Sequence, residues 1–153
     1  MPIADTYVDA SRPTKVFGTT TVIEAGNNPV LQAFLRFSVS GVGGRTVTSA
    51  RLRLTVGSKT ASGSDSGGTV HRITDDSWSE AATNYNNRPA IDGLGLATQG
   101  PVAVKQVVEF PLTGTVTSDG TYNFAIDSAS GDPVSYRPRE SATGKPELIL
   151  TLE

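Results

Sequence analysis

The sequence lacks cysteine altogether and contains one histidine and one tryptophan. Without cysteine the chain has no disulfide scaffold, no zinc–thiolate site and no thiol nucleophile. A single histidine is too few for a histidine-rich metal centre. No apolar run has the length of a transmembrane helix and no signal peptide is visible, so we expect no membrane partner. The chain opens directly on Met1–Asp5, which suggests a module excised from a larger protein.

Charge is also scarce. Only 18% of the residues are charged and the formal net charge is −2, which is too close to neutral for a nucleic-acid partner. Helix-favouring runs of Ala, Leu, Glu and Lys are missing, whereas Thr, Ser, Gly and Val are abundant. With 153 residues the chain has the size of one domain that can bury a core. This composition favours a single all-β domain over residues 1–153.

Apolar residues alternate with polar ones in several short segments. The clearest examples are Ala33–Val39, Ala50–Val56, Tyr122–Ile126 and Leu148–Leu152. A step of two residues places each apolar set on one face of a strand, which predicts half-buried antiparallel strands. Dense Gly, Pro, Asn and Asp turns separate them. We predict an antiparallel β-sandwich, jelly-roll-like, with roughly nine strands.

The segment from Ser79 to Gly100 breaks this pattern and is predicted to be a long loop. Trp78 immediately precedes it and is expected to seal the loop onto the sandwich rather than to serve as a sugar platform. The loop residues Asn84, Asn86 and Asn87 are expected to satisfy loop backbone groups.

The segment Ser135–Glu140 carries a Tyr, two Arg and a Glu between two apolar runs. An arginine fork donates parallel hydrogen bonds that match a carboxylate, and an exposed Tyr136 ring would stack on the apolar face of a pyranose. The alternative for Tyr136 is a core position at a sheet edge. The arginines have an alternative as well, as solvated rungs of the sheet that pair with Glu24, Glu109 or Glu140.

Catalysis has weak support in the sequence. His71 as a base, Tyr136 as an acid and Arg139 as a uronate clamp would make a sensible lyase, but nothing brings the three together. No carboxylate pair of the kind that glycosidases need stands out. We therefore expect a protein that is not an enzyme and that requires no cofactor.

A structural calcium ion is compatible with this module, although no ligand set is evident. The candidate oxygen ligands are Asp5 with Asp9, Asp65, and Asp75 with Asp76. None of them has EF-hand spacing, so the metal ligands stay unassigned. Asp5 and Glu140 have an alternative role, in which they brace the termini by accepting hydrogen bonds from backbone amides.

Several short motifs occur in a familiar order. They are Ala4–Val8, Phe34–Phe37, Val47–Leu54, Trp78–Glu80, Thr83–Pro89, Tyr136–Glu140 and Lys145–Leu148. Together they resemble the DNRLRE-domain family, which is carbohydrate-binding module family ninety-six. The resemblance implies a secreted β-sandwich module found in polysaccharide-degrading enzymes and large surface proteins, with alginate as a ligand of some members. Arg12, Lys15, Arg36 and Tyr136 match the positions that this resemblance associates with alginate binding. Two features depart from the family pattern, namely Pro138 in place of the usual Ser and an N-terminal segment with few lysines.

The predicted function is non-catalytic binding of an acidic, uronate-containing polysaccharide, which would tether a larger extracellular protein. The predicted ligand-binding residues are Arg12, Lys15, Arg36, Tyr136, Arg137 and Arg139. We expect a monomeric module within a multidomain, secreted or cell-surface protein. The alternative is a structural spacer or adhesion domain of a large bacterial surface protein. The two are distinguished by whether the basic side chains gather around an exposed Tyr136.

Overall fold

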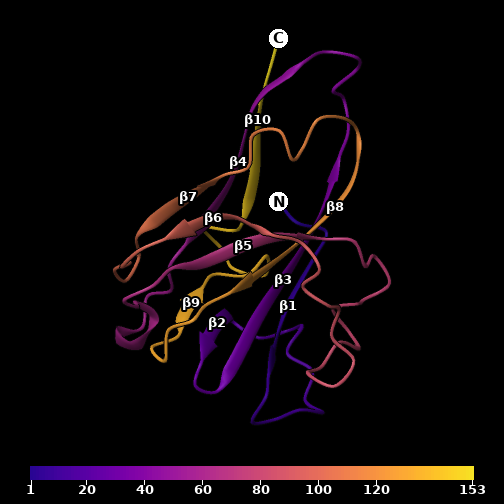
Figure 1. Ribbon diagram of the computed structural model, residues 1–153. Coiled ribbons are helices and arrows are strands. Elements are labelled where there is room, and N and C mark those ends of the chain that lie inside the picture. Colours follow the sequence, from indigo (N-terminus) through magenta and orange to yellow (C-terminus); the bar gives the residue numbers. More distant parts are fainter.

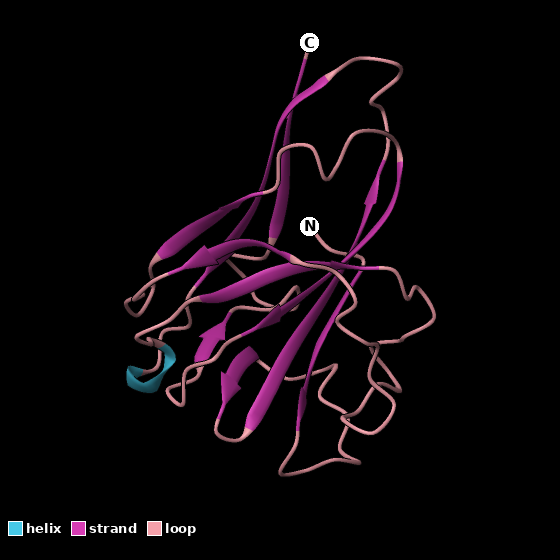
Figure 2. Ribbon diagram, in the orientation of Figure 1, coloured by secondary structure: helices cyan, strands magenta, loops and turns pink.

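Ten β-strands in two antiparallel sheets make up the computed structural model, which describes residues 1–153 (Figure 1). The only helical element is the short turn Thr60–Ser62, drawn in cyan in Figure 2. The predicted all-β sandwich is confirmed. None of the helical structure has the length and hydropathy that a membrane crossing demands.

The larger sheet has seven strands. Six follow the order β6-β5-β8-β3-β2-β9, and β1 pairs with the opposite edge of β3, since Leu31 of β3 is paired both with Gly26 of β2 and with Asp9 of β1. Their bounds are β1 Ala4–Asp9, β2 Ile23–Asn27, β3 Val30–Val39, β5 Gly68–Ile73, β6 Gly95–Gln99, β8 Gly120–Asp127 and β9 Val134–Tyr136. The smaller sheet has the order β10-β4-β7, with β4 Val47–Thr55, β7 Val107–Pro111 and β10 Glu147–Leu152.

The core lies between the two sheets and follows the alternation of the sequence. Ala33, Leu35 and Phe37 of β3 face Ala50 and the other inward residues of β4 in one cluster of 23 buried residues. Complete burial of a Leu or Phe side chain contributes about 1.5–3 kcal/mol, so the cluster explains why the sheets pack on these faces.

The outer face of the larger sheet is covered as well. The irregular segment of residues 74–94, between β5 and β6, lies against β1 and β3 in Figure 1. A second apolar cluster forms beneath it, from Ala4, Val8, Phe34, Ile73, Trp78 and Ala125. Trp78 is 5% exposed and donates from Nε1 to Asn123, so its predicted role as the plug under the loop is confirmed.

This cover corrects one prediction. Half-buried strands were expected, yet every residue of β1 is buried, and Phe34 on the outer face of β3 is fully buried. Alternation describes one face of a strand, and it does not reveal a loop that returns from elsewhere to cover the other face.

The predicted long loop also ends earlier than expected. Gly95–Gln99 forms the edge strand β6, which pairs with β5 from Gly68↔Gln99 onward. A short exposed edge strand that begins with glycine has little apolar alternation, so its sequence resembles a loop. Within the loop, the side chains of Asn84 and Asn87 bond to nearby backbone groups, as predicted.

Candidate functional site

Tyr136 lies in the interior of the sandwich. Its exposed fraction is 0%, and its hydroxyl donates a 2.7 Å hydrogen bond to the carbonyl oxygen of Gly67. Burial raises the pKa of the phenol. The prediction of an exposed stacking ring is therefore wrong, and the alternative of a core tyrosine holds.

The arginines predicted to surround Tyr136 have separate partners within the domain. Arg139 binds Glu80 through two hydrogen bonds of 2.7 and 2.8 Å and also approaches Glu140. Arg137 donates to Thr143, on another part of the same C-terminal segment. Since each guanidinium has its own local partners, the predicted patch beside Tyr136 is not formed.

Arg36 is a structural residue of the covered sheet face. Its guanidinium lies 4.5 Å from the centre of the Trp78 ring and donates 2.8 Å hydrogen bonds to the carbonyls of Asp76 and Trp78. An ion pair with the Asp76 carboxylate completes its surroundings. These contacts hold the long loop on β3 and leave the Arg36 side chain only 16% exposed.

Arg12 and Lys15 come together in the turn that follows β1. The Arg12 guanidinium lies 4.7 Å and the Lys15 ammonium 5.1 Å from the centre of the Phe17 ring. Asp9 pairs with Arg12, whereas Lys15 makes no ion pair. Both residues are exposed, so this part of the predicted basic site is present as an accessible pair of cations.

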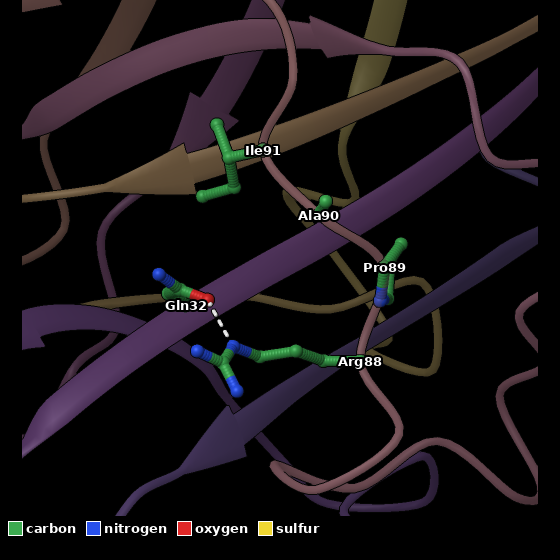
Figure 3. A pocket seen from close by; sticks show the side chains of 5 residues that line it. All are labelled: Gln32, Arg88, Pro89, Ala90 and Ile91. Carbon is green, nitrogen blue, oxygen red and sulfur yellow. Dashed lines mark hydrogen bonds between the residues drawn. The ribbon is translucent and has the colours of Figure 1, made fainter.

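The main surface hollow of the domain lies on the outer side of the larger sheet. It is a groove of about 410 Å³ lined by Gln32 of β3 and by residues 88–91 of the long loop (Figure 3). Pro89, Ala90 and Ile91 form an apolar wall, and Gln32 and Arg88 form a polar one. A hollow of this kind suits a sugar ring, which has apolar C–H faces and a polar rim.

Arg88 is held in place without a carboxylate partner. Its Nε donates a 2.9 Å hydrogen bond to the Gln32 amide oxygen, drawn as the dashed line in Figure 3, and one terminal nitrogen donates to the Tyr85 carbonyl. The guanidinium also stacks over the Tyr85 ring, 3.8 Å from its centre. No acidic side chain forms an ion pair with Arg88. A positioned and uncompensated guanidinium at a groove is suited to bind an anionic group.

The two cationic regions are joined. The backbone N–H of Asn86, in the loop that carries Arg88, donates a 3.1 Å hydrogen bond to the carbonyl of Pro13. Pro13 lies between Arg12 and Lys15 in the sequence. The turn with two cations therefore contacts the loop with the third. We call Arg12, Lys15 and Arg88 the basic rim.

The sequence-based prediction missed Arg88 and Gln32. Arg88 was part of the resemblance motif Thr83–Pro89, but the loop was interpreted only as a structural cover. Pro89 was the available signal, because a residue before proline is held in an extended conformation. Gln32 stands on the polar side of an alternating strand, where nothing in the sequence distinguishes it.

The proposed lyase residues do not assemble. The Gly93 carbonyl accepts a 2.9 Å hydrogen bond from His71 Nδ1, and His71 Nε2 lies 2.8 Å from a carboxylate oxygen of Asp127, so His71 links the long loop to the sheet. Tyr136 is buried and Arg139 is paired with Glu80.

The fold and the groove together define a binding module of the β-sandwich class, with an open hollow on one sheet face. A family model described as carbohydrate-binding module family 96 matches residues 1–152. The chain belongs to that family and is a carbohydrate-binding module. None of the curated proteins matches the sequence.

Proposed function

We propose that this module binds an acidic, uronate-containing polysaccharide of the alginate type in the groove beside Arg88. The observation that carries the proposal is the Arg88 guanidinium, which has no carboxylate partner and is fixed by Gln32 and Tyr85. A uronate carboxylate would receive charge-assisted hydrogen bonds from it. The Pro89–Ile91 wall would contact the ring of the same sugar.

Arg12 and Lys15 extend the proposed site beyond the groove. A polysaccharide is longer than one pocket, and its successive carboxylates need cations along a path. Contact between Asn86 and Pro13 places the turn with Arg12 and Lys15 next to the Arg88 loop. The basic rim would therefore serve several carboxylates of one chain.

The biological role we propose is to tether a larger extracellular protein to its polysaccharide. An open groove with few cations gives a weak single contact, because binding must offset lost translational and rotational freedom. The overall affinity rises when such modules are repeated, or when one is attached to an enzyme that binds the same polysaccharide chain. As a monomer it needs no partner other than the glycan.

One observation favours the alternative of a structural spacer. Arg12, Arg36, Arg51, Arg53 and Arg139 are paired with acidic side chains of the domain itself. Arg51 and Arg53 share Glu109 on the smaller sheet, and none of these three residues lines the groove. If all cations acted in this way, the domain would need no ligand. Arg88 and Lys15 are the residues that separate the two functions.

Affinity electrophoresis in gels that contain alginate tests the proposal. Arg88→Ala should weaken binding about tenfold or more, because a charge-assisted hydrogen bond contributes about 1.5–3 kcal/mol. Arg88→Lys should have an intermediate effect, since it keeps the charge but loses the fork. Arg45→Ala is the matched control, because Arg45 also donates to nearby backbone carbonyls, at Gly41 and Val42, and lies in a loop away from the groove. If Arg88→Ala migrates like the parent in alginate gels, the proposed site is wrong. Failure of the parent itself to bind any acidic glycan would favour the spacer.

A further inference from the structure

Three carboxylates converge where β1, the long loop and the segment after β9 meet. They belong to Asp5, Glu80 and Glu140. One oxygen atom of each lies within 4.8 Å of one oxygen of both others. None of these residues lines the groove beside Arg88. The acidic cluster is therefore separate from the proposed glycan site.

Asp5 is the unusual member of the acidic cluster. Its exposed fraction is 1%, and its Oδ2 accepts a 2.7 Å hydrogen bond from the backbone N–H of Arg139. Its other oxygen, Oδ1, is buried and has no hydrogen-bond partner. A buried carboxylate oxygen without a partner is costly and rare in native proteins. This oxygen is therefore available to a ligand from outside the chain.

The charge of the cluster points to the same conclusion. Arg139 is the only cation in contact with it, and its guanidinium is engaged by both oxygens of Glu80. When all three carboxylates are ionised, the single guanidinium leaves two negative charges uncompensated. Burial, opposed by the Arg139 N–H and reinforced by the Glu140 and Glu80 carboxylates, raises the pKa of Asp5 to about 7. A divalent cation would neutralise this excess.

We propose that Asp5, Glu80 and Glu140 bind a calcium ion. Calcium takes oxygen ligands at about 2.3–2.6 Å, so two oxygens on one ion lie up to about 5 Å apart, which the spacing of the cluster satisfies. Each carboxylate retains lone pairs that no donor in the domain uses, and water can complete the coordination. Magnesium demands near-ideal octahedral geometry and dehydrates reluctantly, so calcium is the better fit.

The site would link three distant parts of the chain. Asp5 lies on β1, Glu80 in the long loop and Glu140 near the C-terminus. The backbone N–H of Asp5 already donates to Glu80, and that of Arg139 to Asp5, so a cation would reinforce contacts that exist. Binding to the folded state alone would stabilise the domain. The role is structural.

Terbium luminescence and thermal unfolding test the site directly. Tb³⁺ replaces Ca²⁺ at oxygen sites. Trp78 is the single tryptophan that can sensitise it, because Trp78 is two residues from Glu80 and shares a buried cluster with Ala4, the neighbour of Asp5. We expect Tb³⁺ emission on excitation of Trp78, displaced by Ca²⁺ and much less by Mg²⁺. At a Ca²⁺ concentration near one hundred times Kd, Tm should rise by about 5 °C or more over the chelator-treated protein.

Two variants make the test specific. Glu140→Gln changes an exposed residue and should fold normally, while it weakens Ca²⁺ and Tb³⁺ binding at least tenfold. Asp5→Asn should remove the Ca²⁺-dependent rise in Tm. Glu153→Gln, an exposed acid outside the cluster, is the matched control and should bind like the parent.

Each alternative result overturns the proposal. An unchanged Tm with millimolar Ca²⁺ and no sensitised emission would show that no cation binds. Equal Ca²⁺ affinity in the parent, Glu140→Gln and Asp5→Asn would place the ion elsewhere. Suppose that the parent shows no Ca²⁺ response and that Asp5→Asn is more stable than the parent at neutral pH. A proton rather than a cation would then occupy Oδ1.

Discussion

The hydroxyl of Tyr136 and the carbonyl of Gly67 form a 2.7 Å hydrogen bond inside the sandwich. The bond lies where the two sheets meet, because Tyr136 also forms a β-bridge with Val56, just after β4. The backbone N–H of Arg137 continues this junction with a 2.9 Å bond to the Thr55 carbonyl. Tyr136 therefore stabilises the corner of the fold.

Tyr136→Phe should lower the free energy of unfolding by about 1–3 kcal/mol, because the Gly67 carbonyl would stay buried without its donor. Urea denaturation followed by circular dichroism measures the loss. Gly67→Ala should also destabilise, since its Cβ would lie 2.6 Å from the Gln99 Cβ and 2.9 Å from the Tyr136 hydroxyl. Retention of Tyr136→Phe in alginate gels should equal that of the parent. A selective loss of binding in this variant, with stability intact, would contradict a purely structural role.

Trp78→Ala should destabilise the domain by about 3–5 kcal/mol, because a large buried ring is lost and a cavity replaces it. The hydrogen bond from Nε1–H to Asn123 and the stacking of Arg36 on the Trp78 ring are lost as well. Residues 74–94 should then become more sensitive to limited proteolysis than the rest of the chain. Trp78→Phe is the milder variant and should show a smaller change in both assays. Equal proteolysis of the parent and Trp78→Ala would mean that Trp78 does not hold the loop.

Lys15→Ala should weaken binding to alginate by about 1.4- to fivefold, as expected for an exposed charge worth about 0.2–1 kcal/mol. Binding of the parent should fall with added salt, because the screening length shortens from about 10 Å at 0.1 M to about 3 Å at 1 M. Titration calorimetry at two salt concentrations measures both effects. Lys59→Ala, an exposed lysine just before the Thr60–Ser62 turn, is the control. Equal losses in the two lysine variants would indicate an unspecific charge effect.

Asp9 makes the stability of the folded domain depend on pH. Burial opposes ionisation of its carboxyl, but hydrogen bonds from Ser11 and Arg12 outweigh burial and lower the pKa of Asp9. A carboxyl with a lower pKa in the folded state stabilises the fold above its unfolded pKa, near 4, and this contribution disappears as pH falls through the folded value. Asp9→Asn should therefore cost about 1–2 kcal/mol at pH 7.

The cost of Asp9→Asn should shrink as the pH falls below about 4, because the unfolded parent then binds a proton at Asp9 and the folded state loses its advantage. Urea denaturation at pH 7, 5 and 3 measures the difference between the two proteins. A difference that stays constant over this range would show that the charge of Asp9 is irrelevant. Asp119→Asn offers a comparison, because Asp119 accepts a hydrogen bond from the Val42 N–H but pairs with no arginine.

The sheets were predictable because alternation is a local property of the chain. Leu52 and Leu54 point inward and Arg51 and Arg53 outward, as the period of two requires. Glu109, one of the acids expected from the sequence as possible partners for arginines of the sheet, pairs with Arg51 and Arg53. Trp78 was placed correctly because a large aromatic beside a loop has few other roles.

The candidate site was not predictable in the same way. Arg139 and Arg88 are both arginines in polar surroundings, yet Glu80 neutralises the first and no acid pairs with the second. Glu80 lies 59 residues from Arg139 in the sequence. Whether a guanidinium is free depends on such distant neighbours, which only the folded chain brings together.

The amino-acid order alone determined the all-β class, the inward faces of the strands and the family of the protein, since each depends on short-range pattern. Tertiary structure decided which groups face water. It buried Tyr136 at the sheet corner, left Arg88 without an acid and gathered Asp5, Glu80 and Glu140. The physical reason is that burial and ion pairing depend on contacts between segments far apart along the chain.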